Sequence, residues 1–154
     1  MALFLQFQIG DDGYVLEAAQ VTRVLPLVAI RGIPHAPAGV AGAINYHRAA
    51  VPVVDLSQIV LGRPATRHLS TRIILLPIRI GGQQRLLGVL AEKVTQTTRR
   101  DAEEFGPTGV TTDGARYLGP VASDGNRLLQ WVNVQQLLPA EVSAALFQDL
   151  EATP

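Results

Sequence analysis

Two side chains of this sequence have types that could act together as a general acid and a general base. Histidine, here His47, is the residue type most often used as a general base, and Asp55 directly follows the apolar run Val51-Pro52-Val53-Val54, a place where catalytic acids often lie. Such chemistry requires both groups in one concave pocket within hydrogen-bond reach. The two residues are eight positions apart across an expected strand. This separation argues against the pair, and a small β-barrel enzyme using Asp55 and His47 stays as the alternative from another functional class.

A structural role for Asp55 is favoured over a catalytic one. Residues 55–62 have the pattern of a short helical turn that ends at Gly62, and a side-chain oxygen at its start can accept hydrogen bonds from the first free amides. We therefore predict that Asp55 caps this turn. Asn133 stands at the matching place in the second half of the chain, and we predict the same role for it.

Motifs for metals, nucleophiles and phosphates are missing. The three histidines, His35, His47 and His68, have no i, i+4 spacing, and there is no cysteine. No serine sits in a Gly-x-Ser-x-Gly elbow, and Gly106-Pro107-Thr108-Gly109 is not followed by the helix start that a phosphate cradle needs. The sequence predicts no catalytic residue, no metal site and no cofactor.

The overall charge argues against nucleic acid as a partner. Thirteen basic and thirteen acidic residues cancel, so the attraction to phosphates is lacking. An RNA-binding barrel would also need exposed aromatic residues, whereas Trp131 and the four Phe residues follow core-like patterns. The apolar runs are far shorter than the ~20 residues needed to span a bilayer, and residues 1–9 alternate in polarity, unlike a signal peptide. We expect a soluble chain that reaches a membrane only through other proteins.

The hydrophobic pattern predicts an all-β domain. Period-two alternation and Asp-Gly or Gly-Gly turn signals indicate short strands along most of the chain: residues 3–9, 14–16, 40–46, 49–56, 71–78, 85–90, 117–122 and 128–132. Residues 17–22 could hold one helical turn, and Pro139-Ala140-Glu141 begins an amphipathic helix with Val142, Leu146, Phe147 and Leu150 on one face. Residues 95–116, with much charge and glycine, are expected to form an exposed, mobile connection.

A faint internal repeat divides the chain into two units. Residues 15–22 are similar to 89–95, and residues 54–60 are similar to 132–138, in the same order. Chance similarity between short β-rich segments is the alternative. A duplication predicts two similar small barrels within one domain that spans residues 1–154. The first would hold roughly residues 14–70 and the second roughly 71–138, with the first strand and the last helix packed on them.

The segment Gly42 to Leu56 resembles the sequence Gly-x-x-Asn-x-Arg-Gly-x-x-x-Pro-Val-x-Asp-Leu of the CheW-like domain family, with matching spacing from Asn45 to Pro52. Further similar segments follow in order along nearly the whole chain. The resemblance implies two intertwined five-stranded SH3-like barrels with short helical turns and a C-terminal helix. It also implies a non-enzymatic adaptor, cytoplasmic and associated with membrane receptor arrays, whose partners are the tip of a methyl-accepting chemoreceptor and a CheA-like histidine kinase.

The resemblance carries a set of receptor- and kinase-binding positions to this chain: Arg23, Asn45, Tyr46, His47 and Arg48. Three of them depart from the family pattern. Arg23 replaces the usual acid, His47 replaces the usual arginine, and Arg48 replaces a glycine, so the usual pair of opposite charges cannot form. We infer an altered choice of partner, as in an auxiliary chemosensory system. A kinase-regulatory module that does not bridge receptors is the alternative within the family.

Overall fold

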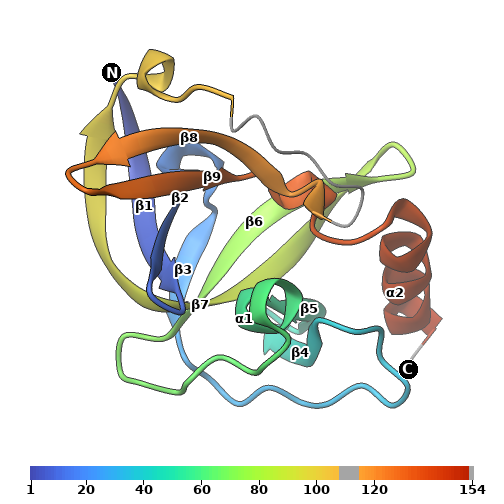
Figure 1. Ribbon diagram of the computed structural model, residues 1–154. Helices are drawn as coiled ribbons and strands as arrows, with labels where there is room; N and C mark the ends of the chain where they lie inside the picture. Colours follow the sequence, from blue (N-terminus) through green and yellow to red (C-terminus); the bar gives the residue numbers. More distant parts are fainter. Residues whose placement is uncertain (108–114, 153–154) are drawn as a thin grey trace.

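The computed structural model describes residues 1–107 and 115–152, and in that part the chain is mostly β-strand, as predicted (Figure 1). The strands are β1 (Ala2–Ile9), β2 (Asp12–Glu17), β3 (Arg23–Pro26), β4 (Val40–Tyr46), β5 (Ala49–Asp55), β6 (Arg72–Ile80), β7 (Gln83–Arg100), β8 (Leu118–Asp124) and β9 (Arg127–Val132). The helices are α1 (Leu56–Leu61) and α2 (Ala140–Ala152), with 3₁₀ turns η1 (Ala18–Gln20), η2 (Ala102–Glu104) and η4 (Val134–Gln136). The expected turn within residues 17–22 is therefore η1.

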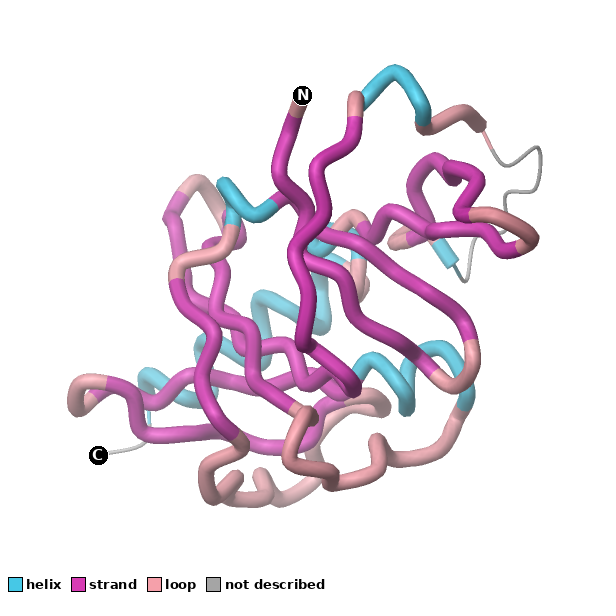
Figure 2. The backbone as a smooth tube through the Cα atoms, turned by 90° about the vertical axis from the view of Figure 1, so that its left-hand side faces the viewer, coloured by secondary structure: helices cyan, strands magenta, loops and turns pink. Residues whose placement is uncertain are grey.

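Two five-stranded sheets share the long strand β7 (Figure 1). Figure 2 shows the backbone from the side, with strands making up most of it. The first sheet has the order β3-β6-β7-β5-β4, and the second has the order β7-β1-β2-β9-β8. The first part of β7 pairs with β6 and β5, and its second part, from Gln96 to Arg100, pairs with β1. Each sheet forms one SH3-like barrel of the fold.

The barrels are intertwined because each takes strands from both halves of the chain. Strands β1 and β2 join β8 and β9, whereas β3, β4 and β5 join β6 and the first part of β7. The two halves of the chain can be matched strand by strand: β1 with β6, β2 with the first part of β7, β3 with its second part, β4 with β8, and β5 with β9. With this matching, the two sheets have the same strand order. This equivalence is the one that the internal repeat implies. The subdomain bounds 14–70 and 71–138 stay a prediction.

The two edges of each sheet are joined by one isolated bridge. In the first barrel, Arg31 N donates to Ala43 O at 2.9 Å and Ala43 N donates to Arg31 O at 2.8 Å. In the second barrel, Gly106 and Val121 exchange the same two hydrogen bonds at 2.8 Å each. Both bridges join the segment after an edge strand to β4 or β8. The pairing between the named strands does not close either sheet. The isolated bridge is what joins the two edges of each sheet into a barrel.

The core strands are buried on both faces, which explains their nearly continuous apolar runs. In β6, Ile73 and Leu75 face the interior of the first barrel, whereas Ile74 and Leu76 join a cluster that contains residues of both sheets. The second barrel encloses Phe4 and Phe105 with the half-buried Trp131, whose ring centroid lies 5.0 Å and 5.1 Å from theirs. Trp131 therefore packs in the core, as its strand position predicted.

The expected mobile connection over residues 95–116 is wrong for its first part. Gln96 to Arg100 continue β7 in an antiparallel ladder with β1, and Phe105 is only 8% exposed. Polar side chains suit this stretch because it is an edge of the second sheet. Residues 108–114 of that prediction lie outside the described residues.

The predicted C-terminal helix is present as α2. Leu146 and Phe147 are buried in the cluster shared by the two sheets, and Val142 is half-buried. The side chain of Leu150 lies outside the described residues. The helix therefore packs on the barrels with the face that its sequence pattern indicates, at the side of the molecule away from the loop that follows α1 (Figure 1).

The bridge that closes the first barrel makes Gly42 sensitive to substitution. A Cβ there would overlap the carbonyl oxygen of Arg31, and φ is +148°. We expect Gly42→Ala to lower the free energy of unfolding by about 2–4 kcal/mol. Gly32→Ala is the matched control, because a Cβ at Gly32 meets no heavy atom within 4 Å. Urea denaturation measures both variants, and equal midpoints would contradict the role of the bridge.

Candidate functional site

A tight turn between β4 and β5 presents four of the five predicted binding residues. β4 ends at Tyr46 and β5 begins at Ala49, so His47 and Arg48 are the two central residues of the turn. Their φ angles are +50° and +69°, as in two-residue hairpin turns of type I′. Asn45 Oδ1 accepts a hydrogen bond from Arg48 N at 3.0 Å. This bond spans the turn and stabilises a conformation that residues other than glycine rarely adopt.

The turn exposes several kinds of polar group. Asn45, His47 and Arg48 are exposed and Tyr46 is half-buried, with the Tyr46 and His47 ring centroids 4.2 Å apart. Ile44, one position earlier in β4, is 3% exposed and anchors the strand in the first barrel. The turn therefore offers an amide, a phenol, an imidazole and a guanidinium on a well-anchored hairpin.

Arg23 lies on a different strand from the other four residues. It is exposed at the start of β3, where it pairs with Leu75 of β6, and β3 and β4 are the two edge strands of the first sheet. The Arg31–Ala43 bridge joins these edges. Within the residues that the structure describes, no ion pair or hydrogen bond links Arg23 to the β4–β5 turn. Arg23 and the β4–β5 turn therefore belong to the same barrel, but no bond joins them among the described residues.

Asp55 caps α1 as the sequence indicates, and it makes one further bond that the sequence did not reveal. Its Oδ1 accepts from Ser57 N at 2.9 Å and from Gln58 N at 3.4 Å. Its Oδ2 accepts from Ala65 N at 2.9 Å, ten residues along the chain. With a side chain 2% exposed, Asp55 fixes both the start of α1 and the loop that follows it.

The predicted capping role of Asn133 is wrong. Asn133 stands directly before η4, but its exposed side chain makes no capping hydrogen bond. Its bonds are made by the backbone: Asn133 N donates to Tyr117 O at 2.7 Å, and Asn133 O accepts from Gln136 N at 3.1 Å. The following element is a single 3₁₀ turn and not an α-helix, so its free amides are fewer and placed differently.

Asp55 and His47 do not share a pocket. They flank β5 at its opposite ends, and a seven-residue strand is about 20 Å long. Asp55 is buried with both carboxylate oxygens occupied, whereas His47 is exposed at the turn. This geometry excludes the acid/base pair that was the alternative reading of the sequence.

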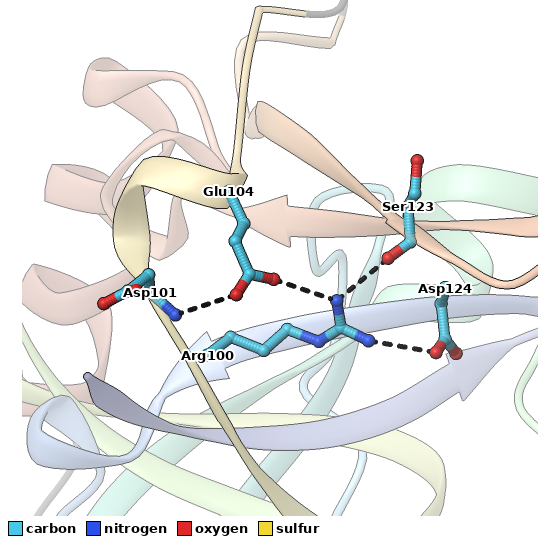
Figure 3. Close-up of polar contacts among 5 residues, drawn as sticks. All are labelled: Arg100, Asp101, Glu104, Ser123 and Asp124. Carbon is cyan, nitrogen blue, oxygen red and sulfur yellow. Dashed lines mark hydrogen bonds and ion pairs between the residues drawn. The ribbon is translucent and has the colours of Figure 1, made fainter.

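A second polar cluster surrounds Arg100, which lies within the segment expected to be an exposed, mobile connection. Figure 3 shows its guanidinium between η2 and the β8–β9 hairpin. Nη2 donates to Asp124 Oδ1 at 2.9 Å, and Nη1 donates to Ser123 O at 2.9 Å and Glu104 Oε2 at 3.3 Å. The Arg100 side chain is only 18% exposed. Pairing across 24 positions gives no local sequence signal, so only the fold could reveal this cluster.

The remaining titratable groups in the described part of the chain add no chemical site. Burial raises the pKa of Tyr14, with a smaller contribution from Asp12, and burial also raises the pKa of Tyr117. Both phenols thus stay neutral in the packed interior. Among the described residues, no group of three His, Cys, Asp or Glu side chains is arranged to hold a metal ion. In the same residues, no helix has the length and apolar character needed to cross a bilayer.

Comparisons with known proteins agree with this fold. A model of the CheW-like domain matches residues 3–142. The chain is 27% identical to chemotaxis protein CheW of Rhizobium meliloti (strain 1021), covering 89% of this chain and 87% of that one. It is 24% identical to chemotaxis protein CheW of Klebsiella aerogenes, covering 92% and 84%. The crystal structure of scaffolding protein TtCheW from Thermoanaerobacter tengcongensis matches with a TM-score of 0.77 at 24% identity, over 90% and 88% of the two chains.

The three bonds to Asp55 predict its effect on stability. Replacing Asp55 with alanine leaves the amides of Ser57 and Ala65 without their acceptor in a buried region, so we expect a loss of about 2–4 kcal/mol in unfolding free energy. Asn133→Ala is the matched control and should change it by less than about 0.5 kcal/mol. Thermal and urea unfolding of both variants measure the difference. Similar losses of unfolding free energy in the two variants would contradict a structural role for Asp55 that Asn133 lacks.

Proposed function

Because the chain belongs to the CheW-like domain family, we propose that it is a chemotaxis scaffold that couples chemoreceptors to a CheA-type histidine kinase. The family match over residues 3–142 carries this proposal, since it includes both barrels and the exposed β4–β5 turn. Proteins of this family are scaffolds and not enzymes. The protein acts by holding two partners in one assembly, at receptor arrays on the cytoplasmic side of a membrane that it touches only through the receptors.

The β4–β5 turn and Arg23 form the proposed receptor surface. Asn45, His47 and Arg48 are exposed, and the turn is fixed by its internal hydrogen bond, so little conformational entropy is lost when a partner binds. The proposed partner on this surface is the helical hairpin at the receptor tip, which would have to supply acceptors for these donors. The anchoring of Ile44 in the core gives the turn a defined place on the first barrel.

The charges of this surface set its choice of receptor. Arg23 is cationic where the family has an acid and His47 stands where the family has an arginine, so a receptor built for that pair meets an unmatched charge at Arg23. Such a mismatch discriminates between parallel pathways more effectively than a small loss of attraction. The proposed setting is therefore an auxiliary chemosensory system with its own receptors.

Reconstitution tests the coupling function. The purified chain, the CheA-like kinase of the same cell and its receptors in membranes are combined, and kinase autophosphorylation is measured with radiolabelled ATP. We expect kinase activity to depend on the receptor only when the chain is present. Binding to the kinase without any receptor-dependent change would instead support a regulatory module that does not bridge receptors, and would contradict coupling.

An exchange of charges tests the receptor surface. The double variant Arg23→Glu with His47→Arg restores the family's pair of opposite charges. We expect its affinity to fall about tenfold for the cognate receptor and to rise for a flagellar-type receptor, measured by titration against both receptor fragments. Arg99→Glu is the control, because Arg99 is exposed on the second barrel. An unchanged preference in the double variant would remove these residues from the receptor surface.

A further inference from the structure

The second barrel is closed by a short strap, residues 101–106, which leads from the end of β7 to the bridge with β8. The strap contains the 3₁₀ turn η2 and ends at Gly106, which exchanges two hydrogen bonds of 2.8 Å with Val121. Two further backbone bonds are internal to it: Glu104 N donates to Asp101 O at 3.0 Å, and Phe105 N donates to Ala102 O at 3.2 Å. The bridge is therefore the strap's backbone attachment to the second sheet.

One side chain anchors the strap in the barrel interior. Phe105 is 8% exposed, and its ring centroid lies 5.1 Å from that of Phe4 and 5.1 Å from that of Trp131. Residues 101–104 are all exposed, and Gly106 is half-buried. The apolar contact that holds the strap closed is therefore a single aromatic ring.

The equivalent segment of the first barrel has more apolar contacts. Its bridge is of the same kind, between Arg31 and Ala43. Leu27 and Ile30, just before the bridge, pack against the interior cluster of the first barrel, and Ile33 packs against the cluster shared by the two sheets. Three half-buried aliphatic side chains support the first closure, whereas Phe105 alone supports the second. The second closure is thus the weaker of the two.

An ion pair at the surface is the strap's remaining attachment. Figure 3 shows Glu104 of η2 directed at the Arg100 guanidinium, with its Oε2 3.3 Å from Nη1. The Glu104 side chain is 45% exposed, so this pair contributes little free energy and is screened by salt. Arg100 also makes two shorter bonds, at 2.9 Å each, to Ser123 O and Asp124 Oδ1. It can therefore stay bound to the β8–β9 hairpin when Glu104 leaves.

The closed strap leaves one charged group incompletely bonded. Nε of Arg100 is buried and has no hydrogen-bond partner among the described residues. Such a donor is costly, because it has given up water without gaining an acceptor. The guanidinium lies between η2 and the hairpin, so moving η2 away lets water reach it. This hydration offsets part of the free energy that opening the strap requires.

We propose that the strap opens by local unfolding while the ladders of both sheets stay paired. Opening withdraws Phe105 from Phe4 and Trp131 and breaks the Gly106–Val121 bridge and the Arg100–Glu104 pair. Phe105 belongs to the separate interior cluster of the second barrel, so the large cluster shared by the two sheets is not disturbed. The second barrel thus has a closed form and an open form that exposes an aromatic face, and this holds whatever partners the protein binds.

Amide hydrogen exchange of the full-length chain, followed by NMR, compares the two bridges directly. We expect the protection factors of the Gly106 and Val121 amides to be at least about tenfold lower than those of Arg31 and Ala43. They should also change little at low urea concentrations, because local opening exposes little surface. Equal protection factors for all four amides, with the urea dependence of global unfolding, would show that the strap does not open by itself and would overturn the proposal.

A variant of Glu104 tests the ion pair. We expect Glu104→Ala to lower the protection factors of Gly106 and Val121 by about two- to fivefold, with the thermal unfolding midpoint unchanged. Glu103→Ala is the matched control, because Glu103 is an exposed acid of the same turn and makes no bond to Arg100. Added NaCl should lower the same protection factors in wild type and have less effect in Glu104→Ala. Equal effects of the two variants would remove the ion pair from the closure.

Thiol labelling gives an independent measure, because the chain contains no cysteine. Ala122 is 3% exposed in the cluster that Phe105 covers, and Ala91 is 2% exposed in the cluster shared by the two sheets. We expect Ala122→Cys to react with a disulfide reagent at least about tenfold faster than Ala91→Cys under native conditions. Equal labelling rates, both rising with urea as global unfolding does, would overturn the proposal.

Discussion

The continuity of β7 is the constraint on which the rest of the structure depends. One backbone of 18 residues supplies a strand to each barrel, so neither sheet can form without positioning the other. The strand changes partner at a bulge. Gln6 and Gln8, two residues apart on β1, pair with Gln96 and Glu92, which are four residues apart on β7. Lys93, with its left-handed φ, lies inside this bulge. The backbone groups of Val94 in the bulge are satisfied, since Val94 N donates to Ser70 O and Val94 O accepts from Arg72 Nε.

The shared strand also explains which parts of the fold could be predicted from sequence. Strands buried on both faces, such as Ile73 to Leu76, have apolar runs that indicate their type and approximate bounds. The second half of β7 has no such signal, because it is an edge strand whose polar side chains face water, and it was taken for a mobile connection. The exchange of strands between halves depends on contacts between residues far apart in the chain. Only the family resemblance, and not the periodicity, pointed to it.

At the candidate site, too, the features that could be predicted from sequence are those whose interacting residues are close together in the chain. The cap by Asp55 was predictable because its acceptor and the amides of Ser57 and Gln58 are within three residues. The bond to Ala65 and the cluster around Arg100 were not, since their partners meet only in the folded chain. Asn133 shows the limit of arguing from a repeat: the backbone position is equivalent, but a 3₁₀ turn follows it and its side chain makes no cap. The β4–β5 turn lacks the Asn-Gly signal of a type I′ hairpin, so its left-handed residues were visible only in the structure.

Rigidity is what links these features to a scaffold. A protein that couples two partners without chemistry can transmit a change only if its binding surfaces keep a fixed relation to each other. Here the β4–β5 turn is the start of β5, and Asp55 at the end of the same strand holds α1 and the loop after it. β5 pairs in parallel with β7, whose far end is clamped to the β8–β9 hairpin by Arg100. Each bond at the surface contributes little free energy. Their effect is on position: a displacement at one end of β5 or β7 is carried along strands whose central residues are buried in the core.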